Sequence, residues 1–318
     1  MHILPAIAAA TDEMETIFRD LHAHPELGFE ETRTSGIVAS KLAEYGVDEV
    51  HTGLGKTGVV ALIHGKSHGN RRVGLRADMD ALPIDEISGV PFSSQTPGTM
   101  HACGHDAHTT MLLGAAKHLA ETRDFDGTAV LIFQPAEEGL GGARQMMADG
   151  LFKTFPVDEI YGMHNSPNGK PGTFDICKGV AMAGAMFFDA HIRGLGSHAA
   201  MPHQSRDTVV IASTLVSQLQ TIVSRNVAPL DSCVMSVTQI HAGAAYNVVP
   251  ENAHIAGTVR YFREEVCNLA MQRMQAICDG IAAAYEVEIN LDMRNVFDVL
   301  VNDHELSDAY IDAATDIL

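Results

Sequence analysis

Apolar and polar residues follow two different patterns along the chain, and the first covers residues 11–182. Apolar positions at helical spacing predict two helices between Thr11 and Gly46, separated by a loop at 22–29. Continuous apolar runs predict strands at 58–65, 71–78, 128–134 and 159–164, with helices at 106–123 and 143–149. Strands that are apolar throughout are typically buried on both faces. We therefore expect an α/β domain with a mainly parallel sheet and helices on both faces.

The pattern changes after about Ala181. Residues 185–194 alternate apolar and polar side chains, which is typical of a strand with one buried face. Helices are predicted at 207–225 and 264–285, and further strands at 233–240, 254–262 and 287–293. This β-α-β-β-α-β order is that of a ferredoxin-like unit. We predict a first domain at 1–182, an inserted α+β domain at 183–293, and at 294–318 a return to the first domain, which stays incomplete.

Composition and charge disfavour several classes of protein. The 318 residues are 46% hydrophobic and 19% charged, which is typical of a globular chain. The formal charge of −19 disfavours nucleic acid as a partner. No apolar run approaches the roughly 20 residues that span a bilayer, and the N-terminus lacks the basic region of a signal peptide, so no membrane association is expected. Five scattered cysteines without a CxxC spacing favour a reducing environment, so we expect a cytoplasmic location.

Polar residues with metal-binding chemistry cluster at the ends of the predicted strands. The segments 74–83, 133–139 and 162–167 follow or close a strand, and 100–109 opens a helix. In open α/β sheets ligands gather beyond the carboxyl ends of the strands, so side chains from these segments should meet at one edge. The residues concerned are Asp78, Asp80, Cys103, His105, Glu137, Glu138 and His164.

Cys103 and His105 flank Gly104, whose freedom to adopt positive φ allows a tight turn that aims both side chains at one point. A thiolate and an imidazole are good ligands for divalent ions such as Zn²⁺, Mn²⁺ or Co²⁺. A buried cysteine beside a helix-capping histidine is the alternative, because a Cys-x-His spacing alone is a weak signal.

Glu137 and Glu138 are adjacent acids just beyond Pro135, where the chain leaves the predicted sheet and both carboxylates can face one site. Their like charges raise each other's pKa when no cation lies nearby. A metal ion removes this cost, with one carboxylate as a ligand and the other as the base that takes a proton from metal-activated water. The alternative is a solvated acidic turn.

His164 ends another apolar strand. Its position at the same sheet edge makes it a candidate ligand rather than a hydrogen-bonded core residue. Asp80 lies in a motif that Leu82 and Pro83 make rigid. It is a candidate acceptor that orients a ligand histidine such as His105, and Asp78 is the alternative for that part.

Four motifs together resemble the M20D branch of the M20 metallopeptidases, which comprises hippurate hydrolases, N-acyl-L-amino acid amidohydrolases and auxin-conjugate hydrolases. They are GLRADMDALP at 74–83, HACGHD at 101–106, QPAEEG at 134–139 and HAAMPH at 198–203. The resemblance extends from about Phe18 to Leu318. It implies an α/β catalytic domain with a ferredoxin-like dimerisation or lid domain, which matches the element order predicted above.

The resemblance also implies roles for individual residues. The family's metal ligands fall on Cys103, His105, Glu138 and His164, and its general base falls on Glu137. The implied site holds two divalent ions, of Mn, Zn, Co or Ni, with a shared water between them. Cys103 stands where related M20 enzymes have a bridging aspartate, which makes it a candidate bridging thiolate.

In the smaller domain the resemblance implies functional roles for three residues. His198 matches a residue that, in M20 dimers, reaches the partner's site and helps to polarise the scissile carbonyl. Asn247 and Arg260 match positions associated with binding substrate oxygens. Ordinary loop or strand structure is the alternative for all three. A homodimer through the lid domain is therefore expected.

The sequence departs from the family pattern at two places. Gly196-Ser197 replaces the Gly-Gly that often precedes the lid-domain histidine. Family members also continue beyond the equivalent of Leu318, with a histidine that supplies a fifth metal ligand. The resemblance thus implies a C-terminally truncated chain, for which we expect fewer than two bound equivalents of Mn²⁺ or Zn²⁺ and poor turnover.

These observations predict a metal-dependent amidohydrolase that cleaves the amide bond of N-acyl amino acids such as hippurate, with Arg260 or its neighbours holding the substrate carboxylate. A dipeptidase or aminopeptidase could use the same site, although it would need an acidic residue for the free ammonium of its substrate. An inactive, truncated metal-binding fragment is the third possibility. Glu137 disfavours it, because a structural metal site has no use for a second adjacent acid.

Overall fold

The computed structural model describes residues 4–315, which divide into two compact units. The first runs to Asp175 and includes the segment from Asp308 onwards, and the second is Ile176–Ser307. The predicted boundaries at 182/183 and 293/294 differ from these because strands β6 (Gly179–Met182) and β13 (Leu300–Asn302) pair with each other and fall in the second unit. The exact domain limits stay a prediction.

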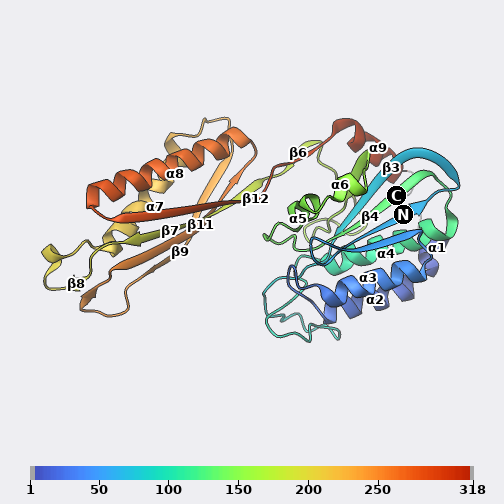
Figure 1. Ribbon diagram of the computed structural model, residues 1–318, viewed down its shortest axis with the longest axis horizontal. Helices are drawn as coiled ribbons and strands as arrows, with labels where there is room; N and C mark the ends of the chain where they lie inside the picture. Colours follow the sequence, from blue (N-terminus) through green and yellow to red (C-terminus); the bar gives the residue numbers. More distant parts are fainter. Residues whose placement is uncertain (1–3, 316–318) are drawn as a thin grey trace. The chain divides into compact units, whose positions relative to one another are not determined.

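A five-stranded mixed sheet forms the centre of the first unit (Figure 1). Its order is β1-β2-β4-β3-β5, from β1 (Glu49–Leu54), β2 (Gly58–His64), β4 (Asp126–Gln134), β3 (Ser67–Asp78) and β5 (Glu159–Gly162). Strands β3, β4 and β5 are parallel, whereas β2 is antiparallel to both of its neighbours. Four strands therefore share one direction, and the expected α/β class is confirmed.

The reversal at β2 comes from a hairpin that the sequence analysis did not predict. Gly55 and Lys56 lie between β1 and β2 and both have positive φ, at 60° and 72°, as the tight turns that join antiparallel strands require. Strand β1 is an edge strand whose residues are exposed or half-buried. It therefore lacks the continuous apolar run that marked β2, β3 and β4.

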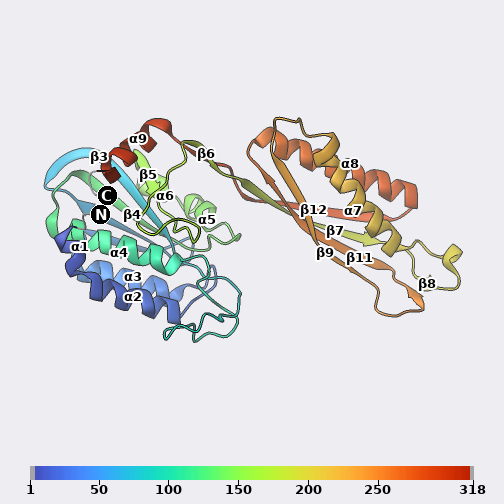
Figure 2. The ribbon, with the colours of Figure 1, turned by 180° about the vertical axis from the view of Figure 1, so that it is seen from behind.

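Helices cover both faces of this sheet because its central strands are apolar on both faces (Figures 1 and 2). On β2, Val59, Ala61 and Ile63 pack against helices α2 (Thr11–Ala23), α3 (Thr32–Glu44) and α4 (His105–Thr122). The alternate residues Val60 and Leu62 pack against α5 (Gly142–Ala148) and α6 (Leu151–Thr154). The remaining helices with residues in this unit are α1 (Pro5–Ala9) and α9 (His304–Thr315).

The second unit has the predicted β-α-β-β-α-β order. Its antiparallel sheet has the order β12-β7-β11-β9, from β12 (Glu288–Phe297), β7 (Gly184–Arg193), β11 (Asn252–Tyr261) and β9 (Cys233–Ala242). Helices α7 (Thr208–Arg225) and α8 (Glu264–Tyr285) cover one face, and their apolar residues share a core with the inward residues of the strands. The other face carries polar side chains on alternate positions. A short ribbon of β8 (Ser197–His198) and β10 (Val248–Val249), and the 3₁₀ helix η1 (Pro202–Gln204), complete the unit.

Candidate metal centre

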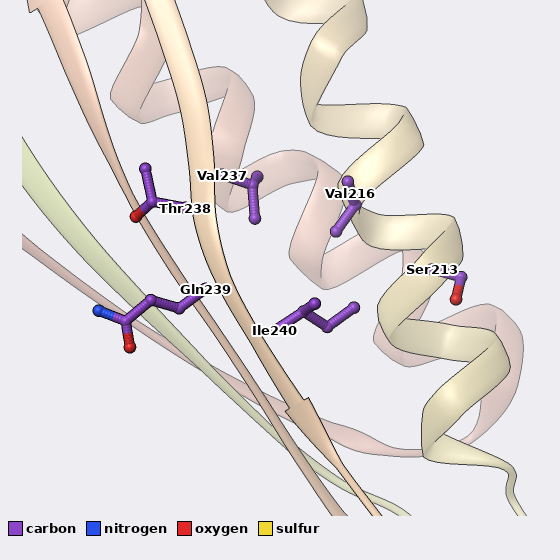
Figure 3. A pocket seen from close by; sticks show the side chains of 6 residues that line it. All are labelled: Ser213, Val216, Val237, Thr238, Gln239 and Ile240. Atoms are coloured by element: carbon purple, nitrogen blue, oxygen red, sulfur yellow. The ribbon is translucent and has the colours of Figure 1, made fainter.

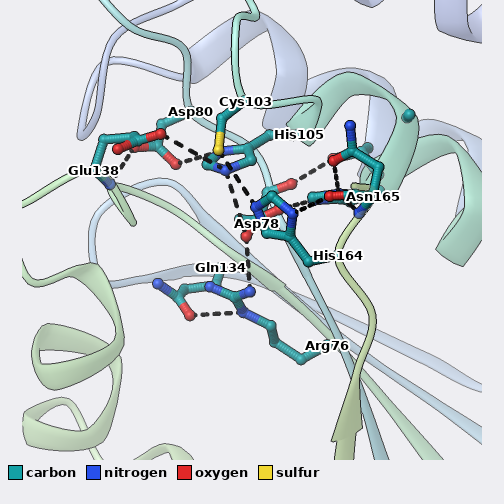
Figure 4. Close-up of polar contacts among 12 residues, drawn as sticks. Arg76, Asp78, Asp80, Cys103, His105, Gln134, Glu138, His164 and Asn165 are labelled. Carbon is teal, nitrogen blue, oxygen red and sulfur yellow. Dashed lines mark hydrogen bonds and ion pairs between the residues drawn. The ribbon is translucent and has the colours of Figure 1, made fainter. Parts of the chain in front are cut away.

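The predicted site residues of the first unit meet at the carboxyl edge of its parallel strands (Figure 4). Asp78 is the last residue of β3, Glu137 and Glu138 follow β4, and His164 follows β5. The fourth segment opens α4, of which His105 is the first residue. Parallel strands end at the same edge, and this brings together side chains that are up to 86 positions apart in the sequence.

Gly104 sets the direction of the Cys103 and His105 side chains. Its φ is +91°, in the left-handed region, as the sequence analysis predicted. A Cβ at this position would also lie 2.6 Å from the side chain of Asn165. Both the backbone conformation and the lack of space therefore favour glycine between the two candidate ligands.

His105 is fully buried and has acidic neighbours around both ring nitrogens. Its Nδ1 lies 3.2 Å from Oδ1 of Asp80. Its Nε2 lies 3.6 Å from Asp78 Oδ2 and 4.0 Å from Glu138 Oε1, and this nitrogen has no hydrogen-bond partner among the described residues. Burial lowers the pKa of His105, but the contact with Asp80, the nearby Cys103 thiol and the charges of Asp78 and Asp80 outweigh it and raise the pKa to about 11. These surroundings strongly favour a positive charge at the position of the His105 side chain.

Cys103 and His164 face each other across the site, with 3.3 Å between Sγ and Nε2. The neighbouring His105 and the hydrogen bond with His164 lower the pKa of the Cys103 thiol, which favours the thiolate that metals bind. The contact with Cys103 raises the pKa of His164 to about 9. The other ring nitrogen of His164, Nδ1, lies 2.7 Å from the carbonyl oxygen of Asn165, which fixes the ring orientation.

Glu137 and Glu138 lie in a turn after β4 and are both half-buried. The turn begins at Ala136, whose φ is +49° and whose N–H donates a 2.7 Å hydrogen bond to the buried Glu31. The backbone N–H of Glu138 donates to Oδ2 of Asp80 at 2.9 Å. Burial, and then the charge of Glu138, raise the pKa of Glu137. The two acids therefore face the site together, in the way a metal ligand and a base would need to.

Sequence reasoning missed His108, which lies one helical turn beyond His105 on α4. Its Nδ1 lies 2.6 Å from Asp78 Oδ1, and its Nε2 accepts a 3.0 Å hydrogen bond from the backbone N–H of Asn165. Both ring nitrogens are thus occupied by neighbours, so His108 connects β3 to the segment that carries His164. The spacing of three between His105 and His108, at the start of the helix predicted at 106–123, is a signal that could have found it, because residues three apart share a helix face.

Asp78 is a fully buried acid of the centre. Arg76 Nη1 donates to its Oδ2 at 2.7 Å, and Arg76 Nε donates to Oε1 of Gln134 at 2.9 Å. Burial raises the pKa of Asp78, but the hydrogen bond with His108 and the charges of Arg76 and His105 outweigh it and hold the pKa well below its usual range. Asp78 is therefore ionised and adds negative charge next to His105.

The donor set fits a divalent ion. Three groups of candidate ligand atoms, each within 4.8 Å of one another, all include His105. They are Cys103, His105 and His164; Asp78, His105 and His108; and His105, Glu137 and Glu138. Thiolate, imidazole and carboxylate together are the ligands of borderline divalent ions, and the buried Nε2 of His105, unpartnered within residues 4–315, is a position that such an ion would satisfy.

The amino-acid sequence matches the family model described as Peptidase family M20/M25/M40 over residues 74–318. The chain belongs to this family. That span takes in both structural units and every candidate site residue, so the family assignment covers the metal centre and the ferredoxin-like unit alike.

Curated relatives and solved structures of the M20 family agree with this assignment. Hippurate hydrolase from Campylobacter jejuni is 43% identical over 317 residues, which are 100% of this chain and 82% of that protein. N-acetyl-L-cysteine deacetylase from Bacillus subtilis is 44% identical, over 94% of this chain and 71% of that protein. The crystal structure of a dinuclear metal-binding M20 peptidase from Bacillus subtilis aligns with a TM-score of 0.78 at 35% identity, over 97% of this chain and 80% of that one. These relatives confirm the prediction of a metallo-amidohydrolase.

The three candidate residues of the ferredoxin-like unit do not form one cluster within that unit. His198 pairs with Val248 in the β8-β10 ribbon, and Ala199 N donates to the carbonyl oxygen of Asn247 at 3.0 Å, so His198 and Asn247 are neighbours. Arg260 lies at the far end of β11, eight residues beyond Asn252. Its guanidinium hydrogen-bonds Thr258 and lies 5.9 Å from the ring centroid of Phe187.

No helix among residues 4–315 is both long and apolar enough to cross a membrane. The five cysteines are all free. The cytoplasmic location stays a prediction.

Proposed function

We propose that this chain hydrolyses the amide bond of N-acyl amino acids, with hippurate-like compounds as the substrate class. The names of its relatives, a hippurate hydrolase and an N-acetyl-L-cysteine deacetylase, support this class. The observation that carries the proposal is the pair Glu137 and Glu138 beside His105, since hydrolysis needs one acid for the metal and another for the proton.

The ligands that we propose for two divalent ions, of Mn, Zn, Co or Ni, are Cys103, His105, Glu138 and His164. A dinuclear metal-binding M20 relative supports the number of ions. Such ions, when bound, lower the pKa of water and polarise a carbonyl group. Asp80 supports this arrangement by accepting from His105 Nδ1 and from the backbone N–H of Glu138, which fixes the His105 imidazole and the backbone that carries the Glu138 side chain.

Glu137 is the general base of the proposed reaction. It takes a proton from the attacking water and returns it to the amine that leaves, so that the water oxygen ends on the acyl carbon and the C–N bond breaks. Its raised pKa makes it a better proton acceptor than an exposed glutamate. Its half-buried position limits competing contacts with solvent.

His198, Asn247 and Arg260 are the proposed substrate-binding residues. A neutral or protonated His198 would donate a hydrogen bond to the oxygen of the scissile carbonyl, and Asn247 and Arg260 would bind substrate oxygens, including the carboxylate. Arg260 lies near the end of β11, whereas His198 and Asn247 lie at the β8-β10 ribbon. Arg260 would therefore bind a different group of the substrate from His198 and Asn247, or contribute to a different site.

A homodimer through the ferredoxin-like unit is part of the proposal. Strand β9 is an edge strand, and Val234 and Ile240 on it are 56% and 53% exposed. A hollow of about 360 Å³ lies between β9 and α7, lined by Val216, Val237, Ile240, Ser213, Thr238 and Gln239 (Figure 3). An open strand edge beside exposed apolar side chains fits a second copy related by twofold symmetry.

Substrate comparison tests this proposal directly. We expect the chain, supplied with Mn²⁺ or Zn²⁺, to hydrolyse benzoylglycine and N-acetylcysteine much faster than glycylglycine, which has a free ammonium in place of the acyl group. Faster cleavage of glycylglycine would favour the dipeptidase alternative. Tight metal binding without hydrolysis of any of these compounds would favour a non-catalytic metal-binding protein.

A further inference from the structure

A second cluster of metal-binding side chains lies within the ferredoxin-like unit, on the sheet face that its helices leave uncovered. Ala190 and Ile192 of β7 point into the helix-covered core, so Asp189 and His191 point to the opposite face. On β11, Ala253 and Ile255 are likewise buried in that core, which places His254 on the open face.

Strand register brings three histidines of this face into one row. His191 of β7 is paired with His254 of β11, and His254 is paired with His241 of β9. The rings of His191 and His254 are stacked, with centroids 4.6 Å apart and an interplanar angle of 13°. The ring of His241 lies 5.9 Å beyond that of His254 at 9°. A hollow of about 450 Å³ lies over this row.

Asp189 completes a set of three ligands with the first two histidines. His254 Nε2 lies 2.7 Å from Asp189 Oδ1, and the ligand atoms of Asp189, His191 and His254 all lie within 4.8 Å of one another. Two ligand atoms on one tetrahedral zinc ion, at about 2.1 Å each, are roughly 3.4 Å apart. Small rotations of the exposed His191 and the half-buried His254 side chains would therefore bring the three ligand atoms to one ion.

The other oxygen of Asp189 is held by Arg294, which hydrogen-bonds Oδ2 and leaves Oδ1 directed at His254. A carboxylate that is oriented by a second hydrogen bond is typical of metal ligands.

We propose that Asp189, His191 and His254 form a second metal site, which takes a borderline divalent ion such as Zn²⁺ and lies wholly within the ferredoxin-like unit. Two imidazoles and one carboxylate are a common three-ligand set for zinc, with water in the fourth position. The ion would replace the proton between His254 and Asp189 and connect strands β7 and β11 across the open face. This site shares no ligand with the metal centre of the first unit.

Zinc titration of the full chain tests this proposal. We compare the wild type with the double variant His191→Asn/His254→Gln, and with His51→Ala as the matched control. His51 is also a half-exposed strand histidine, 2.8 Å from the carboxylate of Glu49, but no second histidine completes a candidate site around it among the described residues. The expected result is the loss of one equivalent of Zn²⁺ in the double variant and no loss in the control.

Residue-resolved modification distinguishes this site from the centre in the first unit. Diethyl pyrocarbonate should modify His191 and His254 several-fold more slowly when Zn²⁺ is present, while His51 should react at the same rate with and without the ion. The double variant should hydrolyse benzoylglycine at the wild-type rate, which also shows that it is folded. Unchanged zinc stoichiometry in the double variant, or equal modification of His191 and His254 with and without Zn²⁺, would overturn the proposal.

Discussion

Asp80 lies 3.2 Å from His105 through Oδ1 and Nδ1, and the two side chains are buried together at the metal centre. This contact fixes the tautomer and orientation of the imidazole and leaves Nε2 directed at the site. The same carboxylate accepts the backbone N–H of Glu138 through its other oxygen, at 2.9 Å. One aspartate therefore positions two proposed ligands, one at the start of α4 and one in the turn after β4.

Asp80→Asn should weaken metal binding by about 10- to 100-fold. A neutral amide orients the His105 imidazole less strongly than a carboxylate does, and it lacks the negative charge that makes the imidazole a better ligand. Isothermal titration with Mn²⁺ or Zn²⁺ measures the change. Asp20→Asn is a matched control, since Asp20 also contacts a histidine, His24, at 3.4 Å, but on the exposed surface of α2. Equal affinities for the wild type and Asp80→Asn would remove Asp80 from the support of the metal centre.

The His108 link between β3 and the His164 segment should affect metal affinity without being a ligand. His108→Ala removes the contacts with Asp78 and with the backbone N–H of Asn165, so the position of His164 becomes less defined. We expect weaker metal binding with an unchanged number of equivalents. A loss of one full equivalent would instead assign His108 as a ligand.

Glu13 should stabilise the packing of α2 against α3 and α4 in a pH-dependent way. Its carboxylate accepts from Lys117 Nζ at 2.6 Å, Tyr45 OH at 2.9 Å and Lys41 Nζ at 3.1 Å. The hydrogen bond with Lys117 is the main cause that lowers its pKa from 4.5 to about 2. Because the pKa is lower in the folded state, the stabilisation is complete above pH 4.5 and is lost as the pH falls from 4.5 towards 2.

Glu13→Gln should therefore lower the free energy of unfolding at pH 7 by about 1–2 kcal/mol, a value reduced for partial solvent exposure. At pH 2.5 the difference between variant and wild type should be much smaller. Urea unfolding of both proteins at the two pH values measures it. A difference that is the same at both pH values would mean that the charge of Glu13 does not contribute to stability.

The role of His198 across a dimer interface can be tested by coexpression. His198→Ala and Glu137→Gln subunits are each expected to be nearly inactive alone. Random association makes about half of the dimers mixed, each with one complete site, so about a quarter of wild-type activity should return. Coexpression of His198→Ala with the His198→Ala/Glu137→Gln double variant is the control and should restore nothing. No recovery in the first mixture would remove the cross-subunit role of His198.

Much of the fold could be predicted because burial leaves a periodic signal in the sequence. Strands β2 and β4 are apolar on both faces since helices cover both, and the alternation in β7 and β11 reflects one covered face. Strand β1 gave no such signal, because an exposed edge strand is not selected for apolar residues. Strands β6 and β13 pair over only a few residues, which is too short for a periodic pattern.

The candidate centre could be predicted as a set of residues, but not as a network. The rule that ligands gather at the carboxyl edge of parallel strands brought Asp80, His105 and Glu138 to one place. The positions of His108 and Asn165 depend on how α4 packs on β3, which is a tertiary contact that local sequence does not encode. The row of His191, His254 and His241 likewise depends on the pairing register of three strands.

The metal content and activity of Glu137→Gln and Glu138→Gln test the central claim most directly. A glutamine at 137 removes the proton acceptor but leaves the ligands, so hydrolysis of benzoylglycine should fall by about 10²- to 10⁴-fold with metal content near that of the wild type. A glutamine at 138 should lower metal content as well as activity. If Glu137→Gln loses the metal while Glu138→Gln keeps it and only turns over more slowly, the roles of base and ligand are reversed and the account is contradicted.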